Sequence, residues 1–180
     1  MIKVIIVILL VLVVAIVSIY AYFGGFTKVQ FKVEEQGGEI LVYQDMVGDY
    51  KQSGVVMNQI YQTLQKEYKI ETYKGFGIYY DNPQEVEKTK LRSEIGCVLE
   101  EKDHSKINNL KDKYKIKVFP KQKYVITEFP HKGTLSIIIG IMKVYPALTK
   151  YVKEHNYNTK GFVMELYDIP GKKTVYRKEM

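Results

Sequence analysis

The N-terminus of this chain is an apolar run that strongly limits what the chain can be. From Val4 to Phe23 a serine is the only clearly polar residue, and two tyrosines stand near the end of the run. In a helix, roughly twenty residues rise about 30 Å, which matches the hydrocarbon core of a bilayer. Tyrosine rings favour the membrane interface. We therefore expect residues 1–25 to be a transmembrane anchor and residues 26–180 to form one domain.

A cleaved signal peptide is the alternative interpretation of this segment. Its apolar core would be roughly 7–15 residues long, and small residues would mark the cleavage site. The run here is longer, and the residues around Ala21 are Ile19, Tyr20 and Tyr22, which suit a signal peptidase badly. The segment therefore favours an uncleaved anchor, whose partner along residues 4–23 is a lipid bilayer.

Residues around the span predict which side of the membrane holds the domain. Only Lys3 precedes the span, whereas Lys28 and Lys32 follow it, so the positive-inside rule places the domain in the cytosol. The single cysteine allows no internal disulfide, and no glycosylation sequon occurs in the chain. We expect a single-pass membrane protein with a cytosolic domain, in the endoplasmic reticulum membrane if the source is eukaryotic.

The chain is basic, with 27 Lys and Arg against 20 Asp and Glu. Arg92 and Arg177 are the only arginines and no nucleic-acid-binding motif is recognised, so we expect no nucleic-acid partner. Between Lys113 and Lys123, lysines largely alternate with other residues, which is typical of strands with one solvated face. The positive charge therefore fits a solvated surface, with attraction to anionic lipid as the alternative.

Two segments of the domain, residues 39–81 and residues 124–168, repeat the same pattern. Each begins with a strand-like run, continues as hydrophobic-Tyr-x-x-Leu-x-Lys, and then reads Lys-Gly-Phe, alternating apolar residues and an aspartate. The pattern predicts a strand, a helix and two strands in each copy. Because such a unit is too short to bury its own apolar face well, the two copies should share one core.

The predicted fold class is therefore α+β. The duplicated units should form an antiparallel sheet with helices 53–67 and 134–153 on one face, preceded by the transmembrane helix. In the second helix one apolar stripe should face the core, comprising Leu135, Ile138, Met142, Tyr145, Leu148 and Val152. The opposite face of the sheet remains as a concave surface, which needs a function or a cover.

Several motifs, in their order and spacing, carry a resemblance to a known family. They are Gly-Ile-Tyr-Tyr-Asp-Asn-Pro at 77–83, Leu-Arg at 91–92, the strand and glycine turn at 124–133, and Met-Glu-Leu-Tyr at 164–167. Across residues 28–178 the chain resembles the GyrI-like small-molecule-binding domains. That resemblance implies a duplicated α+β fold with a ligand pocket.

The anchor and the segments 79–83 and 145–148 are similar to a membrane-anchored animal branch of this family, the testis-expressed reticulophagy receptors. Those receptors lie in the endoplasmic reticulum membrane with a cytosolic domain, and a long disordered tail carries their adaptor-binding motif. The printed sequence ends at Met180 without such a tail. We therefore carry over the anchor and the domain, and not the autophagy role.

The resemblance also implies a set of ligand-binding residues. In multidrug-binding relatives the acidic residue of the Met-Glu-Leu-Tyr strand meets lipophilic cations, which points to Glu165, with Tyr167 on the same face of its strand. The repeat places Tyr79 at the position equivalent to Glu165, and Tyr43 and Phe129 are further expected walls. A buried carboxylate among tyrosines suits a delocalised cation. The alternative is a solvated Glu165 that pairs with a lysine.

Other chemistry has less support in the sequence. We expect no metal and no cofactor, since the three histidines are far apart and belong to no ligand motif. Cys97 alternates with apolar residues, as core residues do. We expect a non-enzymatic, membrane-tethered binding domain for an unknown small molecule, acting as a sensor or receptor. A hydrolase of strained rings using Glu165 with Tyr79 or Tyr167, and an adaptor for a protein partner at the membrane, are the alternatives.

Overall fold

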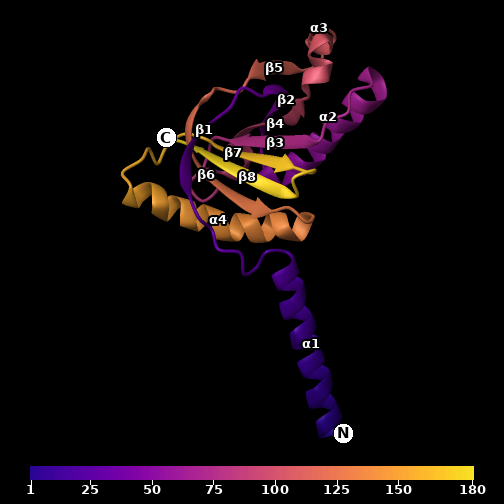
Figure 1. Ribbon diagram of the computed structural model, residues 1–180, viewed down its shortest axis with the longest axis vertical. Helices are drawn as coiled ribbons and strands as arrows, with labels where there is room; N and C mark the ends of the chain where they lie inside the picture. The colour runs from indigo at the N-terminus through magenta and orange to yellow at the C-terminus, as the bar shows by residue number, and fades with distance from the viewer.

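The apolar run forms α1 (Ile2–Tyr22), which stands clear of the rest of the chain in the computed structural model (Figure 1). The structure describes residues 1–180. None of the 21 residues of α1 is buried against protein. The helix is long and apolar enough to cross a membrane. A helix that is apolar on every side is typical of a membrane span or of the core of a large protein.

The remainder of the chain folds around one sheet of eight strands (Figure 1). The strands are β1 (Lys32–Gln36), β2 (Ile40–Val47), β3 (Lys74–Tyr79), β4 (Arg92–Leu99), β5 (Lys115–Val118), β6 (Gln122–Pro130), β7 (Val163–Asp168) and β8 (Lys173–Glu179). They follow the order β1-β6-β8-β7-β3-β4-β2-β5, and every neighbouring pair is antiparallel. The predicted α+β fold class is confirmed.

Two long helices accompany the sheet, α2 (Ser53–Tyr68) and α4 (Thr134–Glu154), and both agree with the predicted helices to within one residue at each end. Shorter helical segments lie at Tyr50–Gln52, Lys88–Lys90, Glu101–Lys106 and α3 (Ile107–Leu110). The residue after α2, Lys69, takes a left-handed conformation with φ of 54°. That conformation ends a helix, because it turns the chain away from the helical path.

The strand order has the two-fold symmetry that the repeat predicts. At its centre β3 pairs with β7, with Ile78 opposite Met164, and β4 and β2 on one side correspond to β8 and β6 on the other. The outermost strands are exchanged between the copies. β1 leads into the first copy but pairs with β6, whereas β5 leads into the second copy but pairs with β2. Each copy therefore completes the sheet of the other.

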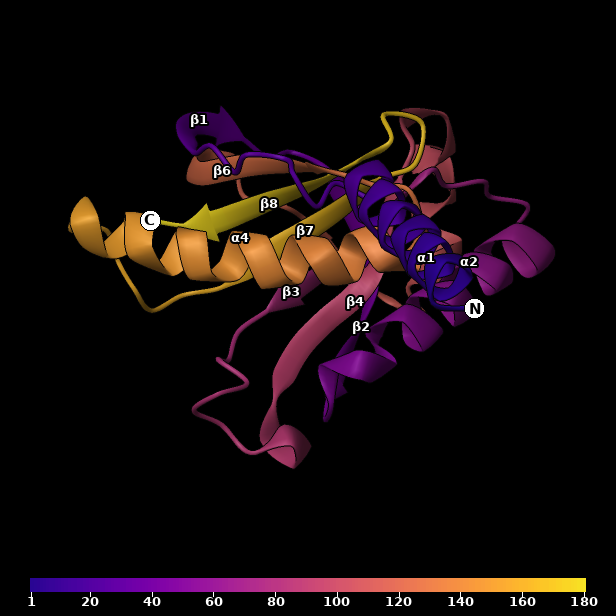
Figure 2. The ribbon, with the colours of Figure 1, turned by 90° about the horizontal axis from the view of Figure 1, so that it is seen from below.

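Both long helices lie on the same face of the sheet, as predicted. Directly paired residues of neighbouring strands share a face, and one such row runs from Cys97 through Gly75, Tyr167 and Thr174 to Phe129. Cys97 packs in one buried cluster with Ile60 and Leu64 of α2. At the other end of the row, Phe129 packs with Val144 of α4. Figure 2 shows α4 lying in front of the strands when the molecule is viewed from below.

The opposite, concave face of the sheet is filled by side chains. We call this cluster the concave core, and it consists of Leu41, Tyr43, Phe76, Ile78, Val98, Phe119, Tyr124, Ile126, Met164, Leu166 and Val175. The connections β1–β2 and β5–β6 close over it, since Phe119 N donates to Glu39 O at 2.8 Å. An ion pair joins the buried Arg177, through Nη2, to Oε1 of the half-buried Glu39 at 2.6 Å.

The concave surface therefore has a cover, which is one of the two outcomes expected for it, and Tyr43 is the one predicted site residue that lies on this face. The two compared segments cover residues 39–81 and 124–168, so they omit Phe119, which joins the concave core from the connection between β5 and β6. Cys97, expected in the core, is 2% exposed and lies on the helix side.

Candidate functional site

Glu165 points toward the helices because of the alternation of β7. Its neighbours Met164 and Leu166 lie in the concave core, so Glu165 and Tyr167 lie on the other face of the strand. Gly77 of β3 and Tyr176 of β8 are the residues directly paired with Glu165. The candidate site therefore sits at the centre of the sheet, beneath the helix layer.

The carboxylate of Glu165 is buried and held by two tyrosine hydroxyls. Tyr145 Oη of α4 donates to Glu165 Oε1 at 2.7 Å, and Tyr167 Oη donates to Glu165 Oε2 at 2.6 Å. Only 2% of Glu165 is exposed. Burial raises the pKa of Glu165, although both hydroxyls favour its charged form, and no lysine or arginine acts on it. The alternative of a solvated glutamate paired with a lysine does not fit this geometry.

Four tyrosines surround the carboxylate, and we call them the tyrosine cluster: Tyr79, Tyr145, Tyr167 and Tyr176. Burial raises the pKa of each phenol, and the charge of Glu165 raises it further, so all four stay protonated at neutral pH. The Tyr176 hydroxyl is buried without a hydrogen-bond partner. The cluster thus offers aromatic faces and one unused donor beside a carboxylate.

Two glycines make room for the tyrosine cluster. A Cβ at Gly77 would lie 2.5 Å from Tyr79 Oη, so the bare backbone of β3 lets the Tyr79 ring lie over the sheet beside Glu165. A Cβ at Gly140 would lie 2.7 Å from Tyr176 Oη and 3.1 Å from the Phe129 ring, so Gly140 lets α4 approach the strands closely. Close approach of backbone to another group is a position that glycine alone can fill.

The structure brings together four of the five predicted site residues. Glu165, Tyr167 and Tyr79 lie in one cluster, and Phe129 packs beside it against Val144 and Tyr176. Tyr43 does not join them. It lies in the concave core, where Lys117 Nζ is 5.0 Å from the centre of its ring. Its neighbour Val42, which pairs with Cys97, occupies the helix face of β2 instead.

Sequence reasoning missed two members of the cluster, Tyr145 and Tyr176. Tyr145 is the tyrosine of the repeated hydrophobic-Tyr-x-x-Leu motif, and it was assigned to the apolar stripe of its helix. The motif itself was the available signal, since a tyrosine recurs there in both copies. Tyr176 lies in β8, outside the compared segments. Only its pairing with Glu165 across the sheet reveals it.

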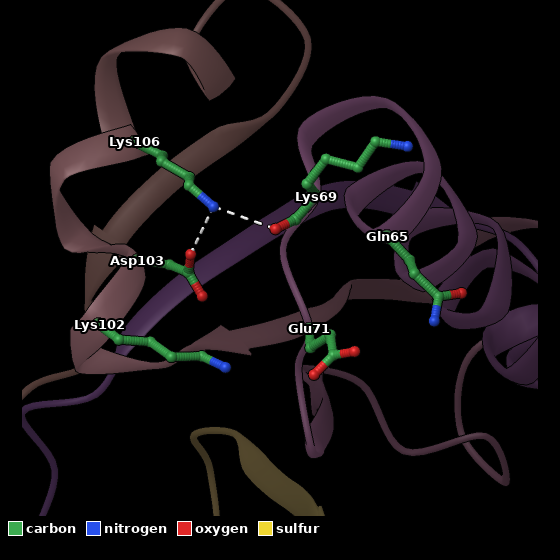
Figure 3. Close-up of a pocket in the computed structure, with 6 residues that line it drawn as sticks. All are labelled: Gln65, Lys69, Glu71, Lys102, Asp103 and Lys106. Carbon is green, nitrogen blue, oxygen red and sulfur yellow. Dashed lines mark hydrogen bonds and ion pairs between the residues drawn. The ribbon is translucent and has the colours of Figure 1, made fainter.

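Two clefts on the surface lie away from the tyrosine cluster. One has a volume of about 550 Å³ and is lined by Gln65, Lys69, Glu71, Lys102, Asp103 and Lys106. In Figure 3, Lys106 Nζ bridges Asp103 Oδ1 at 2.7 Å and the carbonyl of Lys69 at 3.0 Å, so these charges are largely matched within the cleft. The other, of about 710 Å³, lies between residues 25–30 and α4. No group of three His, Cys, Asp or Glu is arranged to hold a metal ion.

A family model for the GyrI-like small molecule binding domain matches residues 30–178. The match covers most of the chain, and the chain belongs to this family. It is similar to testis-expressed protein 264 of Homo sapiens, 29% identical over 144 residues, which make up 73% of this chain and 44% of the human protein. The Mus musculus homolog is 30% identical over 120 residues, 63% of this chain and 37% of that protein. These matches confirm the resemblance to the animal branch, and the chain spans less than half the length of both relatives.

Solved structures share the fold at low identity. The EcmrR chain in an EcmrR–DNA complex superposes with a TM-score of 0.61 and 16% identity, covering 83% of this chain and 56% of that chain. The EcmrR C-terminal domain superposes with a TM-score of 0.58 and 14% identity, covering 83% of this chain and 96% of that chain. SAV2435 bound to tetraphenylphosphonium superposes with a TM-score of 0.51 and 11% identity, covering 83% of this chain and 92% of that chain. These likenesses establish the fold of the domain and nothing about its ligand.

Proposed function

We propose that this chain is a membrane-anchored receptor whose domain binds a lipophilic cation at Glu165. The observation that carries the proposal is a fully buried carboxylate with no basic partner. An unpaired buried charge costs several kcal/mol, which proteins rarely accept without a use. A cationic ligand would supply the missing countercharge.

The tyrosine cluster supports a delocalised cation over a small hydrated one. The negative faces of aromatic rings attract cations, and the effect is strongest where water is excluded. Tyr79, Tyr145, Tyr167 and Tyr176 come from three strands and one helix, so they can surround a ligand on several sides. Small-molecule binding is the description of the family, and SAV2435, which has this fold, was solved with tetraphenylphosphonium.

Ligand entry requires a movement of Tyr145, because the buried carboxylate of Glu165 now accepts a hydrogen bond from its hydroxyl in place of a ligand. Tyr145 lies on α4 directly before Pro146. Proline lacks the N–H that would bond the carbonyl four residues earlier, which weakens the helix locally. We infer that the segment around Tyr145 swings outward and that the cation replaces its hydrogen bond to Glu165.

The anchor completes the proposed function. We propose that α1 spans the bilayer and that the domain lies in the cytosol, as the lysines after the span predict. Protease added to sealed microsomes should digest the domain from the cytosolic side. Protection of the domain from that protease would reverse the topology.

Titration of the full chain in detergent micelles with a fluorescent rhodamine-type cation tests the binding site. Glu165→Gln keeps the shape of the side chain and removes its charge, so the affinity should fall tenfold or more, about 1.4 kcal/mol. Glu154→Gln, an exposed glutamate on α4, is the matched control and should bind like the wild type. Equal affinity of the Glu165→Gln variant and the wild type, or no binding by either, would overturn the proposal and favour the adaptor. Consumption of a strained-ring compound by the wild type alone would favour the hydrolase.

A further inference from the structure

We propose that the outer face of α4 docks on the surface of the bilayer that α1 spans. This inference rests on the membrane anchoring in the proposed function. The docking face consists of Leu135, Ile138, Ile141 and Met142, with Lys132 and Lys143 beside it. Its partner is a lipid surface, bound through acyl chains and phosphate headgroups.

The apolar residues of this face are unburied in the structure. Leu135 is 48% exposed, Ile138 48%, Ile141 42% and Met142 71%. The sequence predicted three of them, Leu135, Ile138 and Met142, in the core, and that prediction is wrong. The buried residues of α4 are instead Ser136, Gly140, Val144, Leu148 and Val152. A group of four large apolar side chains within two turns of a helix needs a cover.

The position of α4 points to the membrane as that cover. Figure 1 shows α4 lying across the bottom of the domain, between the sheet and the end of α1. Lys132 Nζ lies 4.3 Å from the centre of the Tyr22 ring at the end of α1. Further along, Lys143 Nζ donates a hydrogen bond to the carbonyl of Gly25. Contacts at both ends of the docking face therefore hold it close to the point where the chain leaves the bilayer.

The chemistry of the face matches a membrane interface. Helices that lie in the interface carry apolar residues on one side and lysines beside them. α4 contains the lysines Lys143, Lys150 and Lys153 against a single acidic residue, Glu154. Phe26, which follows α1, is 65% exposed and adds an aromatic ring at the same level. Anionic headgroups attract lysines near the surface, so acidic lipid should strengthen the docking.

Because α1 tethers the domain to the bilayer, even a weak contact between α4 and the lipid surface is sufficient for docking. α1 keeps the domain at the bilayer, so docking of α4 becomes an intramolecular step with a high effective concentration. A protein partner or a second copy of the chain could also cover the face. Neither has the continuity with α1 that the contacts of Tyr22 and Gly25 give to the lipid surface.

Depth-dependent quenching on the full chain tests the proposal. The single cysteine, Cys97, is buried, so Cys97→Ser provides a background for one labelled cysteine at a time. An environment-sensitive fluorophore is placed at Met142→Cys on the docking face, at Leu12→Cys within α1, or at Val118→Cys. Val118 is 63% exposed on β5, far from α1 in Figure 1, and is the matched control.

Each chain is placed alone in a nanodisc of brominated phosphatidylcholine with or without phosphatidylserine. The Leu12 probe should be strongly quenched and the Met142 probe quenched by about a third or more, increasing with phosphatidylserine. The Val118 probe should be unaffected. A quenched Leu12 probe with an unquenched Met142 probe would overturn the docking and leave the anchor standing, which would favour a protein partner. An unquenched Leu12 probe would overturn the anchor and the docking together.

Discussion

The hydrogen bond from Tyr145 to Glu165 should make a measurable contribution to stability. Tyr145 Oη donates to the buried carboxylate at 2.7 Å. Hydrogen bonds to charged groups contribute about 1.5–3 kcal/mol, so Tyr145→Phe should lower the free energy of unfolding by about that much at pH 8. The ring remains in place, so little of this loss comes from a cavity. Urea unfolding of the full chain in micelles, followed by tyrosine fluorescence, measures it, since the chain has 16 Tyr and no Trp.

The loss should depend on pH in a defined direction. The hydroxyl favours the charged carboxylate, so its removal raises the pKa of Glu165 further. Below about pH 4, close to the pKa of a glutamate in the unfolded chain, the carboxyl is mostly neutral in both states. The hydrogen bond then links neutral groups, and the loss of unfolding free energy caused by Tyr145→Phe should shrink to about 0.5–1.5 kcal/mol.

Tyr151→Phe is the matched control for this measurement. Tyr151 also lies on α4 and is half-buried, and its ring packs against Phe31 with the ring centres 4.9 Å apart. Its replacement should change the free energy of unfolding by less than about 0.5 kcal/mol. Equal losses for the two variants, or a Tyr145→Phe deficit that stays constant in acid, would refute this account of the site.

Three further predictions test the two faces of the sheet. Phe119→Ala should lower the free energy of unfolding by about 3–5 kcal/mol, whereas Val118→Ala should lower it by less than about 0.5 kcal/mol. Urea unfolding measures both, and similar losses would mean that Phe119 is not a core residue. Burial raises the folded-state pKa of Glu165, so its contribution to stability is complete below the unfolded pKa and is lost as pH rises through the folded pKa. The melting temperature of the wild type should therefore fall relative to that of Glu165→Gln from pH 4 upward, and parallel curves would contradict the shift. Tyr43→Phe should leave the affinity for the rhodamine cation within about twofold of the wild-type value, because Tyr43 lies in the concave core and not in the tyrosine cluster. A tenfold loss of affinity would instead place the ligand on the concave face of the sheet.

The fold was predicted well from the sequence, because the two copies of the duplicated unit share a recognisable pattern of apolar residues and motifs. The motifs at 74–81 and 160–168 fixed the two central strands, and the two helices followed from their 3.6-residue spacing. The filling of the concave face was not predicted, since Phe119 belongs to neither compared segment, and the exchange of β1 and β5 between the copies was not predicted either. Exchange of strands is a tertiary event, and alternation within a strand does not reveal its partner.

The candidate site was only partly predictable, for a related reason. Alternation placed Glu165 with Tyr167, but it could not say which face of the sheet the helices would cover. Tyr43 was therefore assigned to the site, although its register opposite Gly96 puts it on the other face. In α4, helical spacing identified the apolar residues. It could not separate a residue that faces the core, such as Val144, from one that faces outward, such as Met142.

α4 connects the two proposals, because one helix carries both Tyr145, which bonds the carboxylate of the ligand site, and the docking face. Tyr145 points inward to Glu165, while Met142, less than one turn earlier, is 71% exposed on the outside. A lipophilic cation concentrates in the bilayer, so a docked α4 would lie between the source of the ligand and its carboxylate. Movement of the Tyr145 segment would then admit the cation from the membrane side. We therefore expect Met142→Asp, which should weaken docking, to slow association of the cation in vesicles and leave its affinity in micelles unchanged. Equal association rates of the cation with the wild type and with Met142→Asp in vesicles would show that docking of α4 does not assist ligand entry.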